Sequence, residues 1–169
     1  MSRLLWFVLG ILVAFAALFV GGYLFLVSGG VAMETTAPPL PLERTVARLA
    51  LQANLRNAGA ERDPLPNNET TMMAGAQVYR RVCAVCHGLP GGSRSEIARG
   101  MFPDPPQLFE EMVTDDPEGI TYWKVTHGIR LSGMPGFRST LSDTARWQVT
   151  ALVAHADKLT PAVRTALAQ

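Results

Sequence analysis

The chain has 169 residues, of which 48% are hydrophobic and 17% are charged, and its formal net charge at pH 7 is +1. Only Arg3 of its 15 basic residues precedes residue 28, so the rest of the chain carries 14 basic against 14 acidic residues. Nucleic-acid binding requires a strongly basic face, and we therefore expect no nucleic-acid partner.

An uncharged, apolar run extends from Leu4 to Val27. It exceeds the roughly 20 residues that a helix needs to cross the hydrocarbon core of a bilayer. A cleavable signal peptide has a shorter apolar region of about 7–15 residues, although the small residues Gly30-Val31-Ala32 leave cleavage as an alternative. We expect residues 1–28 to form a transmembrane anchor in contact with the lipid bilayer.

The charges flanking this run predict its orientation. Arg3 precedes the run, whereas no basic residue follows it until Arg44. By the positive-inside tendency, the N-terminus stays in the cytoplasm and the rest of the chain is exported. We therefore expect a single-pass protein of the cytoplasmic (inner) membrane of a bacterium, with everything after the span on the periplasmic side.

Residues 29–68 are predicted to be a linker that contains one helix, at about 41–58. Pro41 suits the first turn of a helix, and Leu42, Val46 and Leu49 recur at helical spacing. We interpret this helix as a spacer docked on the following domain, with contact to the membrane or to a partner as alternatives. Residues 60–68 are rich in turn-forming residues.

Residues 69–160 are predicted to form a compact all-α domain, because no alternating strand pattern is evident. A domain of about 90 residues is small for a self-sufficient hydrophobic core and usually needs a staple such as a bound cofactor. The remaining residues, 161–169, are interpreted as a C-terminal tail.

Three helices are predicted in this domain. The first is capped by Thr70 or Thr71 and ends in Val82, the second runs from Pro117 to about Ile129, and the third starts at Ser142. A glycine weakens a helix by about 1 kcal/mol relative to alanine, so a glycine inside the first helix indicates close contact with another helix. We predict that Gly75 and Tyr79 of the first helix meet Trp147 and its neighbours in the third. The proline-rich stretch Leu89–Leu108 is predicted to be an irregular loop over an apolar surface.

The segment Cys83-Ala84-Val85-Cys86-His87 predicts the cofactor. Two thiols three positions apart, followed by an imidazole, form the attachment sequence of a c-type haem. Cys83 and Cys86 can each add to one vinyl group of the porphyrin, and His87 can bind the iron. A redox dithiol would need a thioredoxin-like βαβ pattern, a structural zinc site would need two further ligands, and a disulfide across two residues is unusual.

Gly133-Met134-Pro135-Gly136 is predicted to supply the second iron ligand. A thioether is a weak ligand that must be positioned by its backbone, and here a proline stiffens the segment while two glycines let it turn closely. Met134 lies 47 residues after His87 and can approach the opposite face of the haem. Met101 is the reserve ligand, and the other candidates rank lower: Met72, Met73, Met112, His127 and His155.

These features together resemble the class I cytochrome c family in its small mono-haem form, which is related to the cytochromes of oxidase and dehydrogenase complexes. The resemblance covers about residues 70–159, in the order Gly75/Tyr79, Cys83–His87, Gly133-Met134-Pro135 and Trp147. It implies one covalently attached haem c in an all-α haem domain with a transmembrane helix before it. It also implies that the carbonyl of Pro105 or Pro106 accepts a hydrogen bond from the ligand histidine. In bacteria such haem is attached outside the cytoplasmic membrane, which agrees with the orientation inferred above.

The resemblance implies a carrier of single electrons rather than an enzyme, because two axial ligands leave the iron no open position for a substrate. The expected partners are membrane or periplasmic redox proteins: an oxidase, a dehydrogenase or another cytochrome. A haem sensor or small-ligand-binding protein with a labile sixth ligand, and a structural subunit, are the alternatives. Arginines flank the haem-binding segments and either steer an acidic partner or are compensated by Glu110, Glu111, Asp115 and Asp116; they are Arg80, Arg81, Arg94, Arg130 and Arg138.

Overall fold

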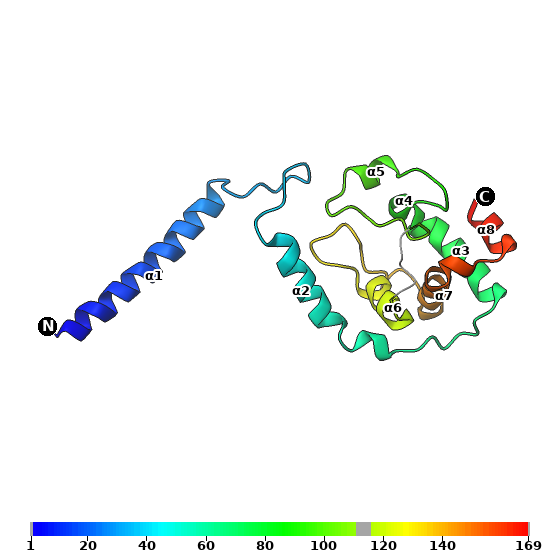
Figure 1. The fold of residues 1–169 in the computed structure, drawn as a ribbon, viewed down its shortest axis with the longest axis horizontal. Helices are drawn as coiled ribbons and strands as arrows, with labels where there is room; N and C mark the ends of the chain where they lie inside the picture. Colours follow the sequence, from blue (N-terminus) through cyan, green and yellow to red (C-terminus); the bar gives the residue numbers. More distant parts are fainter. Residues whose placement is uncertain (1, 111–115, 169) are drawn as a thin grey trace. The chain divides into compact units, whose positions relative to one another are not determined.

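The computed structural model describes residues 2–110 and 116–168, and all regular secondary structure in these residues is helical (Figure 1). The prediction of an all-α chain is confirmed. The chain divides into two compact units, Met1–Pro41 and Leu42–Gln169.

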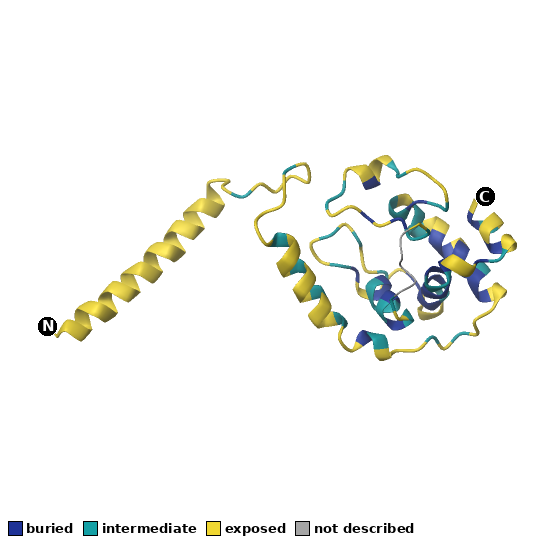
Figure 2. Ribbon diagram, in the orientation of Figure 1, coloured by how far each residue is buried: buried dark blue, intermediate teal, exposed yellow. Residues whose placement is uncertain are grey.

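Helix α1, Arg3–Val27, is the main element of the first unit. The Ser2 hydroxyl caps its start, and the helix gives way at Ser28 to Gly29, which has a left-handed φ of 79°. None of its residues is buried, and Figure 2 shows it exposed along its length. Among the described residues, α1 alone is long and apolar enough to cross a membrane, a criterion that a signal sequence also meets.

Helix α2, Glu43–Leu55, belongs to the second unit, and a 3₁₀ helix, η1 (Ala58–Ala60), follows it. The helix begins later than the predicted residue 41 because Leu42 has a left-handed φ of 66°, outside the right-handed helical region. Leu51 and Leu55 are half-buried, whereas Leu49 is exposed. One face of α2 is therefore part of the compact unit, which agrees with its interpretation as a spacer helix docked on the following domain.

Helices α3 (Glu69–Val82) and α7 (Asp143–Ala154) pack against each other at the centre of the second unit. The Asn68 side chain caps α3, in place of the predicted threonines. Asparagine is among the strongest N-cap residues because its carbonyl oxygen accepts a hydrogen bond from an unpaired backbone N–H of the first turn. Ser142 caps α7 as predicted.

The close contact predicted from Gly75 is with Gln148, the neighbour of Trp147. A Cβ at Gly75 would lie 2.2 Å from the Gln148 carbonyl oxygen, so only glycine lets the two helices approach this closely. The Trp147 ring stacks on Tyr122 of helix α6 (Glu118–His127), with ring centroids 3.9 Å apart and planes at 9°. Trp147 therefore ties α7 to α6, while Gly75 ties α7 to α3.

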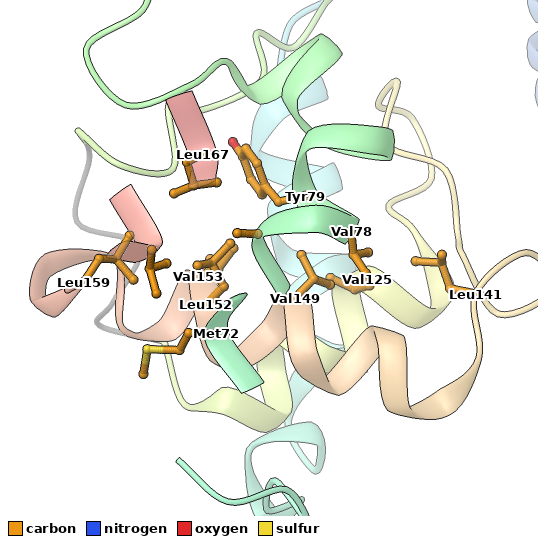
Figure 3. Close-up of a cluster of buried hydrophobic side chains, with 12 residues drawn as sticks. Met72, Val78, Tyr79, Val125, Leu141, Val149, Leu152, Val153, Leu159 and Leu167 are labelled. Atoms are coloured by element: carbon orange, nitrogen blue, oxygen red, sulfur yellow. The ribbon is translucent and has the colours of Figure 1, made fainter. Parts of the chain in front are cut away.

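The C-terminal residues form helix α8, Pro161–Ala168, after a short 3₁₀ helix, η2 (Ala156–Lys158). Val163 and Leu167 of α8 are fully buried and belong to the same apolar core as α3. Figure 3 shows Leu167 in this core. Residues 161–168 therefore form part of the folded domain, whereas the sequence predicts a C-terminal tail. Val163 and Leu167 are four residues apart and therefore lie on the same face of α8. An eight-residue segment is too short for this spacing to predict a helix from the sequence.

The core of the second unit forms where α3, α6, α7 and α8 meet (Figure 3). Tyr79, Leu152 and Leu167 are its largest fully buried side chains. The core lies to one side of the haem-attachment segment, and Val82, Cys83 and Met134 pack on its edge. The cofactor site is therefore built on the rim of a packed helical core.

Candidate haem-binding site

Cys83, Cys86 and His87 lie on a single helical turn directly after α3. Cys83 ends α3, and helix α4 (Ala84–His87) continues from it, with the backbone N–H of His87 donating to the Cys83 carbonyl at 2.9 Å. The turn stops at Gly88, whose φ of 74° favours glycine. This geometry places both thiols and the imidazole along one short stretch of backbone.

A cavity of about 410 Å³ lies beside this turn. Cys83, Cys86 and His87 line it from one segment, and Met134 lines it from another. Most of the other described lining residues are apolar, among them Val82, Leu108, Val125, Phe137, Val149 and Val153. The structure thus brings the predicted attachment residues and the predicted second ligand to one apolar cavity.

The imidazole of His87 is held by the proline-rich loop. Its Nδ1–H donates to the Pro106 carbonyl at 2.9 Å, which leaves Nε2 as the nitrogen available for a metal. Burial lowers the pKa of His87, against an opposing effect of the Pro106 hydrogen bond, and a neutral imidazole is the form that binds iron. Of the two prolines named from the sequence, Pro106 makes this bond, and Pro105 is buried and lines the cavity.

The hydroxyl of Tyr79 fixes the other side of the turn. It donates to the Gly88 carbonyl at 2.8 Å, within the buried core. Burial, with a smaller effect of Cys83, raises the pKa of Tyr79, so its hydroxyl stays protonated and able to donate. The sequence indicated Tyr79 as a core residue but not this bond, since nothing in the pattern shows where a carbonyl beyond His87 lies.

Both cysteines are free thiols and are half-buried. Burial, with a smaller contribution from Cys86, raises the pKa of the Cys83 thiol to about 12. A low pKa is the mark of a reactive redox or metal-binding thiol, and Cys83 shows the opposite shift. Among the described residues no group of three or more His, Cys, Asp or Glu side chains is placed to hold a metal ion, so the zinc alternative has no ligand set here.

The loop that carries Met134 is fixed by its own backbone and by a serine. Ile129 N–H donates to the Met134 carbonyl at 3.1 Å, and the Ser132 hydroxyl donates to the Ile129 carbonyl at 2.7 Å. The Met134 N–H donates to the same hydroxyl at 3.2 Å. Gly128, with a φ of 70°, lies so close to this loop that a Cβ there would be 2.8 Å from the Met134 carbonyl oxygen.

Met101 also lines the cavity, on the same side as the Met134 loop. Its terminal methyl lies 1.9 Å from where a Cβ of Gly133 would be, so the bare backbone of Gly133 makes room for it. Met72 is buried in the core, Met73 packs against that core, and Met112 lies outside the described residues. Two methionines therefore reach the cavity, Met134 and the reserve candidate Met101.

The two remaining histidines do not line the cavity. His127 is exposed, with its ring centroid 4.9 Å from that of Trp123. Both nitrogens of His155 are engaged, because Nδ1 donates to the Ala151 carbonyl at 2.9 Å and Nε2 accepts from the Asn67 amide at 2.9 Å. Their low ranking as ligands agrees with these positions.

Among the lining residues, Leu51 and Lys124 were not singled out from the sequence, and Asp116 was named only as a compensating charge. Leu51 reaches the cavity from α2, so its wall extends outside the predicted haem domain of residues 69–160. Lys124 and Asp116 form an ion pair on the wall, with Nζ and Oδ2 2.5 Å apart. Leu51 is far in sequence from the other lining residues, and no local pattern reveals its contact with the cavity, whereas Asp116 and Lys124 lie eight residues apart.

Most arginines proposed to steer a partner are exposed: Arg80, Arg81, Arg130 and Arg138. Arg94 instead pairs with Asp104, with Nη1 and Oδ2 2.9 Å apart. Asp116 pairs with Lys124 rather than with one of these arginines, and Glu111 and Asp115 lie outside the described residues. Four arginine side chains near the haem-attachment and Met134 segments are thus exposed to solvent.

The family model of cytochrome c oxidase, cbb3-type, subunit III matches residues 70–153. Residues 70–153 form a cytochrome c domain. The family resemblance drawn from the sequence is confirmed, and so is the all-helical fold class with an N-terminal apolar helix. No curated protein matches the chain.

A cytochrome c domain implies covalent haem c and haem-based electron transfer, and such domains typically serve as electron carriers rather than enzymes. Cys83, Cys86 and His87 fit the Cys-x-x-Cys-His attachment motif of the family. The residues of this cytochrome c domain also suit the cofactor, because thiols, a neutral imidazole and a thioether meet at one apolar cavity. The His87 hydrogen bond to Pro106 supplies the outer contact that orients a ligand imidazole.

Proposed function

We propose that the protein is a membrane-anchored mono-haem c-type cytochrome that carries single electrons, and that His87 and Met134 would hold its iron. The observation that carries this proposal is that His87 and Met134, from segments 47 residues apart, line the same cavity as both cysteines. When bound, the haem supplies reversible one-electron chemistry between Fe(III) and Fe(II).

The chain's own residues hold and shield the cofactor. Cys83 and Cys86 would attach it through thioethers, and the Pro106 carbonyl orients the imidazole of His87. The hydrogen bonds of Ser132 and Ile129 fix the backbone of the Met134 loop. Two protein ligands would leave no open position, which favours electron transfer over substrate binding.

We propose that α1 anchors the protein in the inner membrane of a bacterium, with the cytochrome c domain on the periplasmic side. Arg3 before the helix and the absence of basic residues after it until Arg44 support this orientation. The partners would be membrane or periplasmic redox proteins, namely an oxidase, a dehydrogenase or another cytochrome. The family's description as an oxidase subunit favours the first. Exposed arginines near the cavity, such as Arg81 and Arg130, suit an acidic docking surface.

Optical spectra of two matched variants test the ligand assignment. Met134→Ala should abolish the methionine-to-iron charge-transfer band of the oxidised protein while covalent haem and helix content are unchanged. Met101→Ala, which removes the other thioether at the cavity, should retain the band. The reverse result would make Met101 the ligand. A wild-type protein that lacks the band and binds added small ligands would favour the haem sensor.

A further inference from the structure

The outward face of α2 is apolar. Leu42, Val46 and Leu49 expose 72%, 61% and 61% of their surface, and their spacing of four and three residues places them on one side of the helix. The opposite side carries Leu51, which lines the haem cavity. Helix α2 is therefore apolar on both sides, and only one of them is covered by the second unit.

A loop next to α2 extends this apolar surface. Leu131 exposes 76% of its surface and lines a hollow of about 320 Å³ together with Ala50 and other residues of α2. Leu42 and Leu131 are also the two described non-glycine residues with left-handed φ angles, 66° and 62°. Such a backbone is unfavourable for a bulky side chain, and here it holds two leucines out into solvent.

Basic residues predominate around this surface, although the acidic residue Glu43 begins α2. Between Arg44 and Ala60 the sequence contains three arginines and no acidic residue, and Arg130 directly precedes Leu131. Arg48 and Arg130 are exposed. A helix with an apolar face and basic neighbours is the pattern that lies in the interface of a bilayer with anionic lipids.

The chain also limits how far this surface can move from a membrane. Residues 28–42 connect α1 to α2, and fifteen residues span at most about 50 Å when fully extended. If α1 spans a bilayer, α2 is confined within that distance of its surface, which raises the effective concentration of a weak surface contact.

We propose that the apolar face of α2, formed by Leu42, Val46 and Leu49 and continued by Leu131, rests on the surface of a phospholipid bilayer that contains anionic lipid. This inference rests on the membrane anchor of the proposed function. Because Leu51 lines the cavity from the other side of α2, a helix about 10 Å across would then separate the haem cavity from the lipid.

Nitroxide labels on the complete haem-loaded protein in phosphatidylcholine–phosphatidylglycerol vesicles test the proposal. With both native thiols consumed in thioethers, Leu49→Cys provides a single reactive thiol, and Leu131→Cys provides a second probe in a separate variant. Both labels should be more accessible to oxygen than to a water-soluble nickel complex. Thr165→Cys, an exposed position of α8 outside the proposed contact, is the control and should show the reverse.

Two results would overturn the proposal in different ways. Equal exposure to the nickel complex at Leu49, Leu131 and Thr165, in protein that floats with the vesicles, would overturn the surface contact and leave the anchor intact. Protein that fails to float would overturn the anchor and the surface contact together. Reversible oxidation and reduction of the haem, measured on the same samples, reports on the electron-carrier proposal independently of both.

Discussion

The backbone of Gly75 in α3 lies directly against the carbonyl of Gln148 in α7, with room for a hydrogen atom but not for a methyl group. Helix α3, which leads into the haem-attachment turn, and helix α7, near the C-terminal end of the domain, are thus in contact through main-chain atoms. Backbone atoms cannot rotate away as a flexible side chain can, so this contact fixes the separation of the helices.

We predict that Gly75→Ala destabilises the protein by about 2 kcal/mol, because overpacking a close contact outweighs the gain of about 1 kcal/mol in helix propensity. The midpoint of denaturant unfolding, followed by circular dichroism, measures this loss. Gly100→Ala is the control, since a Cβ there would lie 3.6 Å from the nearest atom, and its effect should stay within about 0.5 kcal/mol. A Gly75→Ala protein as stable as the control would mean that α3 and α7 separate readily.

Removing the Tyr79 hydroxyl should leave the Gly88 carbonyl without its partner. We predict that Tyr79→Phe lowers the free energy of unfolding by about 1–3 kcal/mol at pH 7, the usual cost of an unsatisfied buried group. Thermal unfolding at constant salt measures the difference, which should be accompanied by an unchanged amount of covalent haem. Equal stability at pH 7 would show that water satisfies the carbonyl.

We also expect the stability difference between wild type and Tyr79→Phe to depend on pH. Because burial raises the pKa of Tyr79 in the folded state, its contribution is fully present below the pKa of an unfolded tyrosine, about 10, and declines as the pH rises above it. The stability difference between wild type and Tyr79→Phe should therefore be constant from pH 7 to 9 and shrink above pH 10. A difference that grows above pH 10 would contradict a buried, protonated Tyr79.

Arg146 of α7 joins the segment after the Met134 loop to the core. Its guanidinium donates to the Leu141 carbonyl at 2.8 Å and to Asp143 Oδ1 at 2.7 Å, while only 8% of the residue is exposed. Arg146→Met should cost about 2 kcal/mol, since hydrogen bonds from a charged group are lost and a carbonyl loses its partner. Urea unfolding should show a change below about 1 kcal/mol for Arg99→Met, whose ion pair with Glu96 is exposed.

Helix α8 should be required for stability. Leu167 is fully buried against the core, and Leu167→Ala should cost about 2–5 kcal/mol, whereas Arg164→Ala on the exposed side of the same helix should cost far less. Differential scanning calorimetry of the two variants compares them directly. Similar melting temperatures for both would show that α8 contributes little to folding.

The helix boundaries predicted from the sequence are wrong where a helix is short or where contacts with other parts of the chain decide its ends. Asn68 caps α3 although two threonines follow closely, because the cap depends on the backbone geometry just before the helix. Helix α8 is too short for its spacing to be distinctive, and packing of Val163 and Leu167 on α3 stabilises it. Leu51 reaches the cavity only because α2 folds back onto the domain.

Local chemistry made the cofactor predictable from the sequence: Cys83, Cys86 and His87 are close in the chain, and their spacing matches the haem-attachment motif of the family. The apolar run of α1 was equally direct, because length and composition are enough to define it. Tertiary structure alone decided that Pro106, and not Pro105, bonds His87, that Met101 joins Met134 at the cavity, and that α2 supplies part of the wall. These facts depend on side chains from distant segments meeting in space, and such meetings are set by the packing of the whole domain rather than by any one stretch of chain.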